Sequence, residues 1–176
     1  MISLRKIGSA DLHHIWAQGY SQVEPVWAKY DAPFLHTYQQ LTWERFNIRE
    51  AAFFKSDHVA GIFNDDQIIG AVNYYWENEK TRWLEIGLVI FSEGNWSQGY
   101  GSEVIKQWTS AMFEKFPMIQ RVGFTTWSGN QGMARLGEKN NFSLEARLRK
   151  VRYFEGEYYD ELRYGILRSE WEQESC

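Results

Sequence analysis

Apolar and polar positions alternate along several segments of this 176-residue chain, a pattern typical of strands with one buried face. The alternation predicts strands over residues 2–7, 58–64, 67–77, 82–91, 119–127, 142–154 and 158–167. Turn-forming residues separate two of these pairs, with Asn64-Asp65-Asp66 in the first and Glu155-Gly156-Glu157 in the second. Each pair is therefore expected to form a hairpin.

A helical period appears between these strands. From residue 99 or 100 to 116, the apolar residues Val104, Ile105, Trp108, Met112, Phe113 and Phe116 fall on one face, and Pro117 marks the end. Further helices are expected over 10–20, with Ser9 as N-cap, over 39–53, and over 130–140. The predicted order is β-α-α-β-β-β-α-β-α-β-β, a mixed sheet with helices packed on it. We find no linker, so residues 1–176 are expected to form one domain.

Composition and charge narrow the function classes. The chain is 44% hydrophobic and 24% charged, which is typical of a globular protein. Its net charge is −4, and it has no dense block of Lys and Arg that would form the basic face needed to bind nucleic acid. The most basic stretch, residues 147–152, alternates, which indicates either the solvated face of a strand or contact with an anionic cofactor or acidic substrate.

Targeting and metal-binding signals are not found. Cys176 is the single cysteine, so no intrachain disulfide or cysteine metal site is expected, and the four His show no metal-ligand spacing. With no signal peptide and no apolar run long enough to span a membrane, we expect a cytoplasmic protein that binds no metal, membrane or nucleic acid.

The segment from Glu93 to Glu103 carries the most chemical information. A strand ends, a loop turns, and the long amphipathic helix begins at Gly99-Tyr100-Gly101. Backbone N–H groups at a helix N-terminus lack intrahelical partners and form an anion site. Glycine at 99 and 101 would let a phosphate approach the backbone, although a capping or packing role explains them as well. Neither a P-loop nor a dinucleotide fingerprint is present, because Lys and a third glycine are missing.

Four motifs in order resemble the GNAT acetyltransferase superfamily, and within it the branch of ribosomal-protein-alanine N-acetyltransferases and related small-amine acetyltransferases. They are Leu84-Glu85-Ile86-Gly87-Leu88-Val89-Ile90, Trp96-Ser97-Gln98-Gly99-Tyr100-Gly101, Thr126-Trp127-Ser128-Gly129-Asn130 and Glu138-Lys139-Asn140-Asn141-Phe142. The resemblance covers nearly the whole chain. It implies an α/β (α+β) fold with a mostly antiparallel sheet of six to seven strands, flanked by helices and splayed between strands 82–91 and 119–127.

The resemblance also implies a binding mode for acetyl-coenzyme A as cosubstrate. The backbones of Leu88, Val89 and Ile90 would pair with the pantetheine arm, and Asn130 would touch it. The amides of Gln98, Gly99, Tyr100, Gly101 and Ser102 would hold the pyrophosphate. The family loop reads Gln/Arg-x-x-Gly-x-Gly/Ala; Trp96 departs from its first position, which leaves binding to the backbone amides.

Transfer to an amine needs a base, because a primary amine is mostly protonated at neutral pH. Glu85 is the candidate. Strand alternation places it with Trp83, Gly87 and Val89 on a largely apolar face, where burial would raise the pKa of the carboxyl. The alternative is a strand carboxylate paired with Arg or Lys. No acid is evident, because Met133 and Gly137 occupy the positions of the family's usual Ser and Tyr; Ser128, Tyr153 or Tyr159 would have to substitute, or the thiolate leaves unaided.

In the family the first two helices and the last hairpin flank the acceptor. The corresponding residues here are Glu24, Trp27, Tyr30, Asp31, Tyr38, Trp43, Phe46, Tyr153, Tyr158, Tyr159 and Asp160. Aromatic rings with carboxylates suit an amine, although core packing and plain surface exposure explain them too. Acetyl transfer to a primary amine is therefore one hypothesis; transfer of a larger acyl group and a silent coenzyme-A-binding module are others. Relatives often dimerise, so a homodimer is possible.

Overall fold

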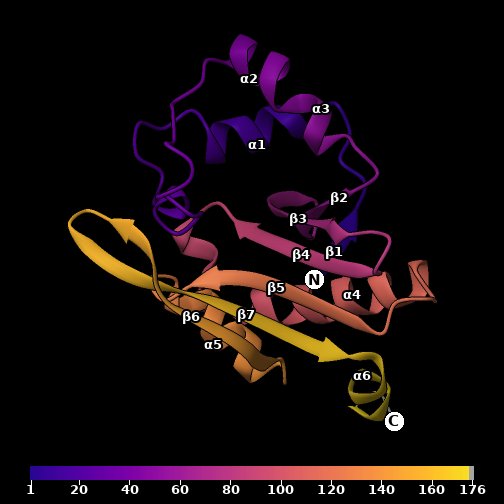
Figure 1. The fold of residues 1–176 in the computed structure, drawn as a ribbon. Coiled ribbons are helices and arrows are strands. Elements are labelled where there is room, and N and C mark those ends of the chain that lie inside the picture. Colours follow the sequence, from indigo (N-terminus) through magenta and orange to yellow (C-terminus); the bar gives the residue numbers. More distant parts are fainter. Residues whose placement is uncertain (175–176) are drawn as a thin grey trace. The chain divides into compact units, whose positions relative to one another are not determined.

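The computed structural model describes residues 1–174; residues 175–176, and with them Cys176, lie outside the described part. Figure 1 shows the elements. In order they are β1 (Ile2–Arg5), α1 (Asp11–Gly19), the 3₁₀ helix η1 (Val26–Lys29), α2 (Trp43–Arg49), α3 (Ala51–Phe54), β2 (Val59–Asn64), β3 (Gln67–Asn78), β4 (Trp83–Ile90), the 3₁₀ helix η2 (Glu93–Asn95), α4 (Tyr100–Lys115), β5 (Arg121–Trp127), α5 (Gln131–Lys139), β6 (Ser143–Phe154), β7 (Glu157–Leu167) and α6 (Arg168–Glu174).

The seven strands form one mixed, mostly antiparallel sheet, as expected, and their order in it is β1-β2-β3-β4-β5-β7-β6. β4 and β5 run parallel and pair at two positions, Leu84 with Val122 and Glu85 with Gly123, although β4 continues to Ile90 and β5 to Trp127. β7 inserts antiparallel between β5 and β6. Both predicted hairpins are confirmed, with Asn64 paired to Gln67 and Phe154 to Glu157. In the second hairpin Glu155 and Gly156 both have positive φ, the backbone of a tight two-residue turn.

Two helical expectations need correction, and one further helix was not expected. Ser9 does not cap α1; instead the carboxylate of Asp11 accepts a hydrogen bond from the backbone N–H of Gly8 at 2.7 Å. The helix expected over residues 39–53 is two short helices: Thr42 caps α2, which begins only at Trp43, and Glu50, with φ −115°, separates α2 from α3. The C-terminal helix α6 was not expected from the pattern.

The chain divides into two compact units, each with its own buried residues. The first unit comprises Met1–Asn73 and Leu88–Val104. Its core joins α1, α2, α3, β2 and β3 and is rich in aromatic residues; it contains Leu12, Ile15, Trp27, Phe46, Phe54, Phe63, Ile68 and Phe91. Burial of these rings supplies the main stabilisation of the unit.

The second unit comprises Tyr74–Gly87 and the chain from Ile105 onward. The Phe124 ring stacks on Tyr164 with centroids 5.2 Å apart and packs against Phe142. Arg168 closes the C-terminus of α4, because its guanidinium donates to the carbonyls of Phe113 and Phe116 at 3.1 Å. These contacts fix β5, β7 and α4 in the unit that carries Glu85.

Candidate functional site

The N-terminus of α4 has the backbone of an anion site. Gly99 has φ +85°, and a Cβ built on it would meet no atom within 4 Å, so its surroundings are open. The carbonyl of Gly99 accepts from the N–H groups of Ser102 and Glu103 at 3.1 and 3.3 Å. Within the described residues, the N–H groups of Tyr100 and Gly101 donate to no protein acceptor, which is the usual state of a first helical turn. The positive end of the helix is therefore available to an anion.

Trp96 stabilises this loop, which explains the side chain that departs from the family pattern. Its indole Nε1 donates to the carbonyl of Ile90 at 2.9 Å, and its ring contacts that of Tyr30 at a centroid distance of 5.8 Å. At the other end of the loop, Asn64 donates to the hydroxyl of Tyr100 at 3.4 Å. Trp96 thus ties the loop back to the end of β4.

Leu88, Val89 and Ile90 belong to the same unit as this loop. They complete β4, with Ile90 buried and Leu88 and Val89 half-buried. A Cβ on Gly70 would lie 2.2 Å from the carbonyl oxygen of Val89, so this close approach of backbones requires glycine at 70. The structure therefore places Leu88, Val89 and Ile90, expected to pair with pantetheine, in the same unit as the expected pyrophosphate loop.

Asn130 and Glu85 belong to the other unit. Asn130 is the N-cap of α5, where its Oδ1 accepts from the backbone N–H of Met133 at 3.0 Å. Its side-chain oxygen therefore has a structural task at the start of α5.

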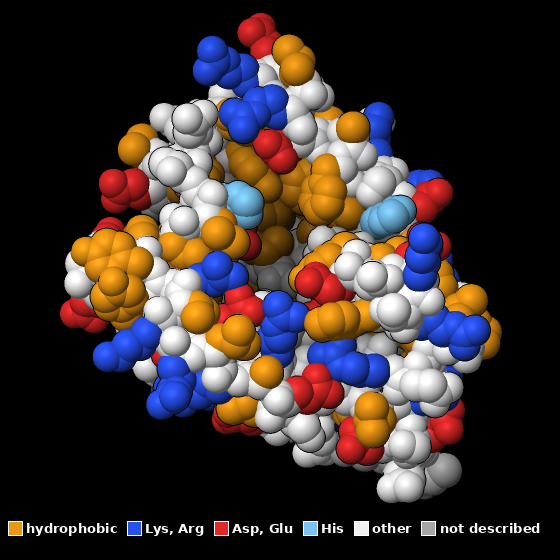
Figure 2. All heavy atoms as spheres, in the orientation of Figure 1, with side chains coloured by type: hydrophobic (Ala, Val, Ile, Leu, Met, Phe, Trp, Pro, Cys, Tyr) orange, Lys and Arg blue, Asp and Glu red, His pale blue; other side chains and the backbone are white. Residues whose placement is uncertain are grey.

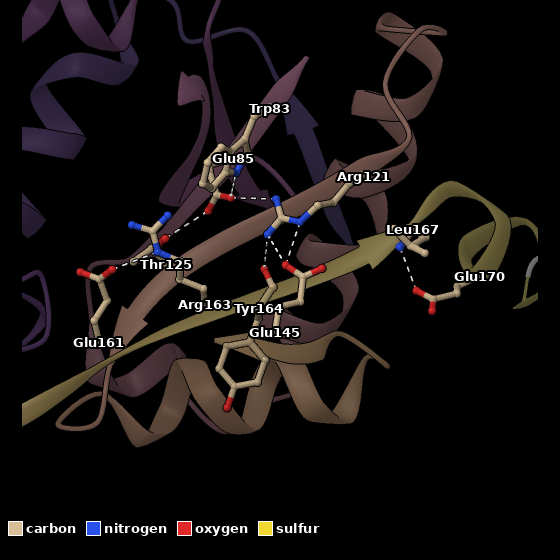
Figure 3. A network of polar contacts seen from close by, with 10 residues as sticks. All are labelled: Trp83, Glu85, Arg121, Thr125, Glu145, Glu161, Arg163, Tyr164, Leu167 and Glu170. Atoms are coloured by element: carbon tan, nitrogen blue, oxygen red, sulfur yellow. Dashed lines mark hydrogen bonds and ion pairs between the residues drawn. The ribbon is translucent and has the colours of Figure 1, made fainter. Parts of the chain in front are cut away.

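Glu85 is almost fully buried at 1% exposure, at the centre of the polar network in Figure 3. Its Oε1 accepts from Nη1 of Arg121 at 2.9 Å and from the indole Nε1 of Trp83 at 2.7 Å. Its Oε2 accepts from the hydroxyl of Thr125 at 3.3 Å. The surroundings are thus polar, unlike the apolar face expected, because β5 brings Arg121 and Thr125 beside β4. Glu85 therefore makes the contacts of the alternative considered from the sequence, a strand carboxylate paired with Arg or Lys.

Arg121 carries the network across the sheet. Its Nε and Nη2 donate to Oε2 of Glu145 on β6 at 2.8 and 2.7 Å. Burial acts to lower the pKa of Arg121, but hydrogen bonds to Glu145 and Glu85 outweigh burial and raise the pKa above its ordinary value. Arg121 therefore stays a cation between two carboxylates.

Tyr75 on β3 lies within the field of the same network. Burial raises the pKa of its hydroxyl to about 12, and the negative charges of Glu85 and Glu77 act in the same direction. Tyr75 is therefore a neutral phenol at physiological pH.

Sequence reasoning missed Arg121, Thr125 and Glu145. A signal was present, because Arg121, Gly123 and Thr125 alternate along one strand and share a face. What was missing was the register that places Gly123 opposite Glu85.

Comparison with known proteins decides the family. Residues 2–143 match the family model described as the acetyltransferase (GNAT) domain. The chain belongs to the GNAT acetyltransferase family.

Two curated relatives come from Bacillus subtilis (strain 168). The uncharacterized N-acetyltransferase YoaA is 32% identical over 102 residues, 58% of this chain and 56% of YoaA. The SPbeta prophage-derived uncharacterized N-acetyltransferase YokL is 30% identical over 109 residues, 62% of this chain and 60% of YokL. The matches span less than two-thirds of either relative.

Solved GNAT structures share the fold. The acetyltransferase from Bacillus anthracis superposes with a TM-score of 0.74 at 20% identity, covering 96% of both chains. The spermidine N-acetyltransferase from Vibrio cholerae, solved with CoA and spermine, gives 0.73 at 18% identity and covers 97% of both chains.

The acceptor-side residues expected in this GNAT chain have varied environments. Phe46 and Trp27 are buried in the core of the first unit, and Trp43 stacks on Phe46 at 5.8 Å. Tyr153 and Tyr158 are 60% and 63% exposed near the turn of the β6–β7 hairpin, where Figure 2 shows hydrophobic side chains beside Lys and Arg. For Phe46 the core-packing interpretation is confirmed, whereas Trp27, for which surface exposure was the alternative, is buried instead.

Asp160 and Ser128 are engaged with the backbone of the second unit. The carboxylate of Asp160 accepts from Nε of Arg147 at 2.5 Å and from the N–H of Lys150 at 2.8 Å. The hydroxyl oxygen of Ser128 accepts from the N–H of Asp160 at 2.9 Å. Both side chains therefore shape the hairpin.

No helix among residues 1–174 has the length and apolar character needed to cross a membrane. In the same part of the chain, no cluster of three or more His, Cys, Asp or Glu side chains has the arrangement of a metal site.

Proposed function

We propose that this GNAT protein is an N-acetyltransferase that moves the acetyl group of acetyl-coenzyme A to a primary amine. The observation that carries the proposal is the N-terminus of α4, where Tyr100 and Gly101 offer backbone N–H groups beside the open surface at Gly99. Backbone N–H donors at a helix N-terminus can bind the oxygens of a diphosphate whatever side chains the loop carries.

The cosubstrate would be held by backbone rather than by charged side chains. The amides of Gln98 to Ser102 would bind the pyrophosphate, and the backbones of Leu88, Val89 and Ile90 would pair with pantetheine. Asn130 would contribute through the part of its amide not used in capping α5.

Glu85 would serve as the base. The proton of the substrate ammonium first passes through water to Oε2 of Glu85, and the neutral amine then attacks the thioester carbonyl. The C–S bond breaks, and the leaving thiolate takes the second proton that the nitrogen loses as the amide forms. Oε2 is the candidate atom because its single hydrogen bond, from Thr125, is the longest that the carboxylate accepts. No covalent enzyme intermediate is needed.

A second candidate function is a silent module that binds coenzyme A. It is favoured by Gly137, where a Cβ would lie 2.6 Å from the buried Phe124 ring, so this position has no room for the family's Tyr. In the leading proposal the thiolate leaves without a strong acid, which its low basicity permits.

Finer features remain predictions from the sequence. These are one functional domain over residues 1–176, a cytoplasmic location, a possible homodimer, and kinship with the ribosomal-protein-alanine branch. That kinship favours a protein N-terminus as acceptor, whereas the spermidine acetyltransferase fold neighbour makes a polyamine the alternative. A larger acyl group in place of acetyl also stays open.

A panel assay tests the proposal. Purified protein is given acetyl-coenzyme A with spermidine, spermine, free amino acids and a peptide with N-terminal alanine, and free thiol is measured. The enzyme releases thiol with at least one amine and is stabilised thermally by acetyl-coenzyme A but not by ATP. Stabilisation without thiol release would favour the silent module, and equal stabilisation by ATP would contradict both.

A further inference from the structure

The guanidinium of Arg121 uses its donors in two directions. Nη1 donates to Glu85 at 2.9 Å, while Nε and Nη2 donate to Glu145, and Nη2 also reaches the carbonyl of Tyr164 at 3.2 Å. Only the planar guanidinium places several donors in such a fixed fork. Figure 3 shows Arg121 between the two carboxylates.

This arrangement makes the two oxygens of Glu85 unequal. Oε1 receives two short hydrogen bonds, from Trp83 and Arg121, whereas Oε2 receives one of 3.3 Å from Thr125. Glu85 itself is buried, but Thr125 is exposed, so Oε2 is directed to the side of the strand pair where a solvent-exposed residue lies. Rotation of the carboxyl would break both bonds to Oε1.

We infer that Arg121 is a positioning residue for proton transfer: together with Trp83 it immobilises Oε1 of Glu85, so that Oε2 alone receives the proton. The inference rests on the proposed role of Glu85 as base. Glu145 supports this role indirectly, because it accepts hydrogen bonds from Nε and Nη2 of the same guanidinium.

Two glycines in the sheet leave space for the side chains of Arg121 and Glu145. Gly123 on β5 stands opposite both Glu85 and, on β7, Gly165. A Cβ on Gly123 would lie 2.2 Å from Nη2 of Arg121, and a Cβ on Gly165 would lie 2.3 Å from Oε1 of Glu145. Two glycines in one row across the sheet therefore leave the space that Arg121 and Glu145 fill.

A double-mutant cycle tests the inference with acetyl-coenzyme A and the amine that the panel turns over faster, spermidine or the N-terminal-alanine peptide. Arg121→Lys keeps the charge but loses the fork. We expect kcat to fall at least about tenfold, a part of the 10²–10⁴ that a general base supplies, with KM for acetyl-coenzyme A unchanged. In the Glu85→Gln background the same substitution is expected to change kcat by less than about twofold, because Arg121 acts through Glu85.

Arg163→Lys is the matched control. Arg163 lies over the Trp83 ring at 5.5 Å and pairs with Glu161 at 3.0 Å, and it makes no hydrogen bond to Glu85, so kcat should stay at the wild-type value. Melting curves verify that each variant folds. If Arg121→Lys does not fold, Glu145→Gln, which loosens Arg121 without removing it, replaces it in the cycle.

The outcomes distinguish the positioning role of Arg121 from the role of Glu85 as base. An equal loss of kcat from Arg121→Lys in both backgrounds would overturn the positioning role and leave the base in place. Wild-type kcat in Glu85→Gln alone would instead remove the base, and with it the proposed mechanism. A loss confined to the Glu85 background supports the inference.

Discussion

Gly165 on β7 and Glu145 on β6 share a space that only one side chain can occupy. A Cβ on Gly165 would lie 2.3 Å from one carboxylate oxygen of Glu145 and 2.5 Å from the other. The absence of a side chain at 165 thus lets Glu145 reach Arg121 at 2.7 Å. A methyl group at position 165 would therefore meet the flexible end of the Glu145 side chain and not the backbone.

Gly165→Ala should therefore displace Glu145 rather than disrupt the sheet. We expect the free energy of unfolding to fall by about 1 kcal/mol, since Arg121 and Glu145 are both partly exposed. Urea denaturation measures the change. In a Glu145→Ala background the same substitution should cost almost nothing; a similar loss in both backgrounds would indicate backbone strain instead.

Gly101→Val should block coenzyme-A binding, because a branched side chain would stand where the pyrophosphate meets the first turn of α4. We expect the affinity for coenzyme A, measured by calorimetry, to drop more than about tenfold, or about 1.4 kcal/mol. Gly94→Val is the control in the same loop, because a Cβ on Gly94 meets only the Ser92 hydroxyl, at 3.7 Å. Undiminished affinity in Gly101→Val would refute the loop assignment.

Glu85→Gln should lower turnover by about 10²-fold or more with little change in the affinity for acetyl-coenzyme A. The amide keeps the shape of the carboxyl, and its oxygen can still accept from Arg121, so the loss reports the missing base. Rates of thiol release are compared from roughly pH 6 to pH 9. Unchanged turnover across that range would exclude Glu85 as base.

Asp160 should make stability depend on pH. Lys150 is in a bulge of β6, with φ +54°, and its N–H donates to Asp160, as does Arg147. The hydrogen bond from the Lys150 backbone, followed by that from Arg147, lowers the pKa of Asp160 below its ordinary value. Such a carboxylate stabilises the fold above the unfolded-state pKa of about 3.9, and the contribution is lost as pH falls through the lower folded-state pKa.

The comparison is between wild type and Asp160→Asn. Their melting temperatures should differ by a constant amount between about pH 7 and pH 5, and the gap should narrow below about pH 4. Circular dichroism melts at stepped pH measure it. A gap of the same size at the lowest pH would show that the charge of Asp160 plays no part.

Phe46→Ala should strongly destabilise the first unit. The Phe46 ring has no exposed surface and stacks on Phe54 at 5.9 Å. The expected loss is about 3–5 kcal/mol, because a cavity remains where the ring was. Phe53→Ala is the control, since Phe53 is 47% exposed and its loss should cost less than about 1 kcal/mol. Chemical denaturation of both variants tests the difference.

Much of the architecture was readable from periodicity. The apolar face of α4 and the alternating strands were predicted within a few residues, because buried faces repeat with a period that local geometry sets. Capping was less certain: Ser9 looked like an N-cap, but the Asp11 carboxylate reaches the free N–H of Gly8 instead. Several side chains near a helix start compete for one donor, and the pattern does not rank them.

The sequence by itself determined the family, the order of the strands along the chain and the loop before α4, since these depend on local spacing and on motifs read in order. Only the tertiary structure decided what surrounds Glu85. Its partner Arg121 is 36 residues away along the chain, and strand register, not alternation within β4, places the guanidinium beside the carboxylate. Register depends on how whole strands bury their faces together, so a segment read in isolation cannot reveal it.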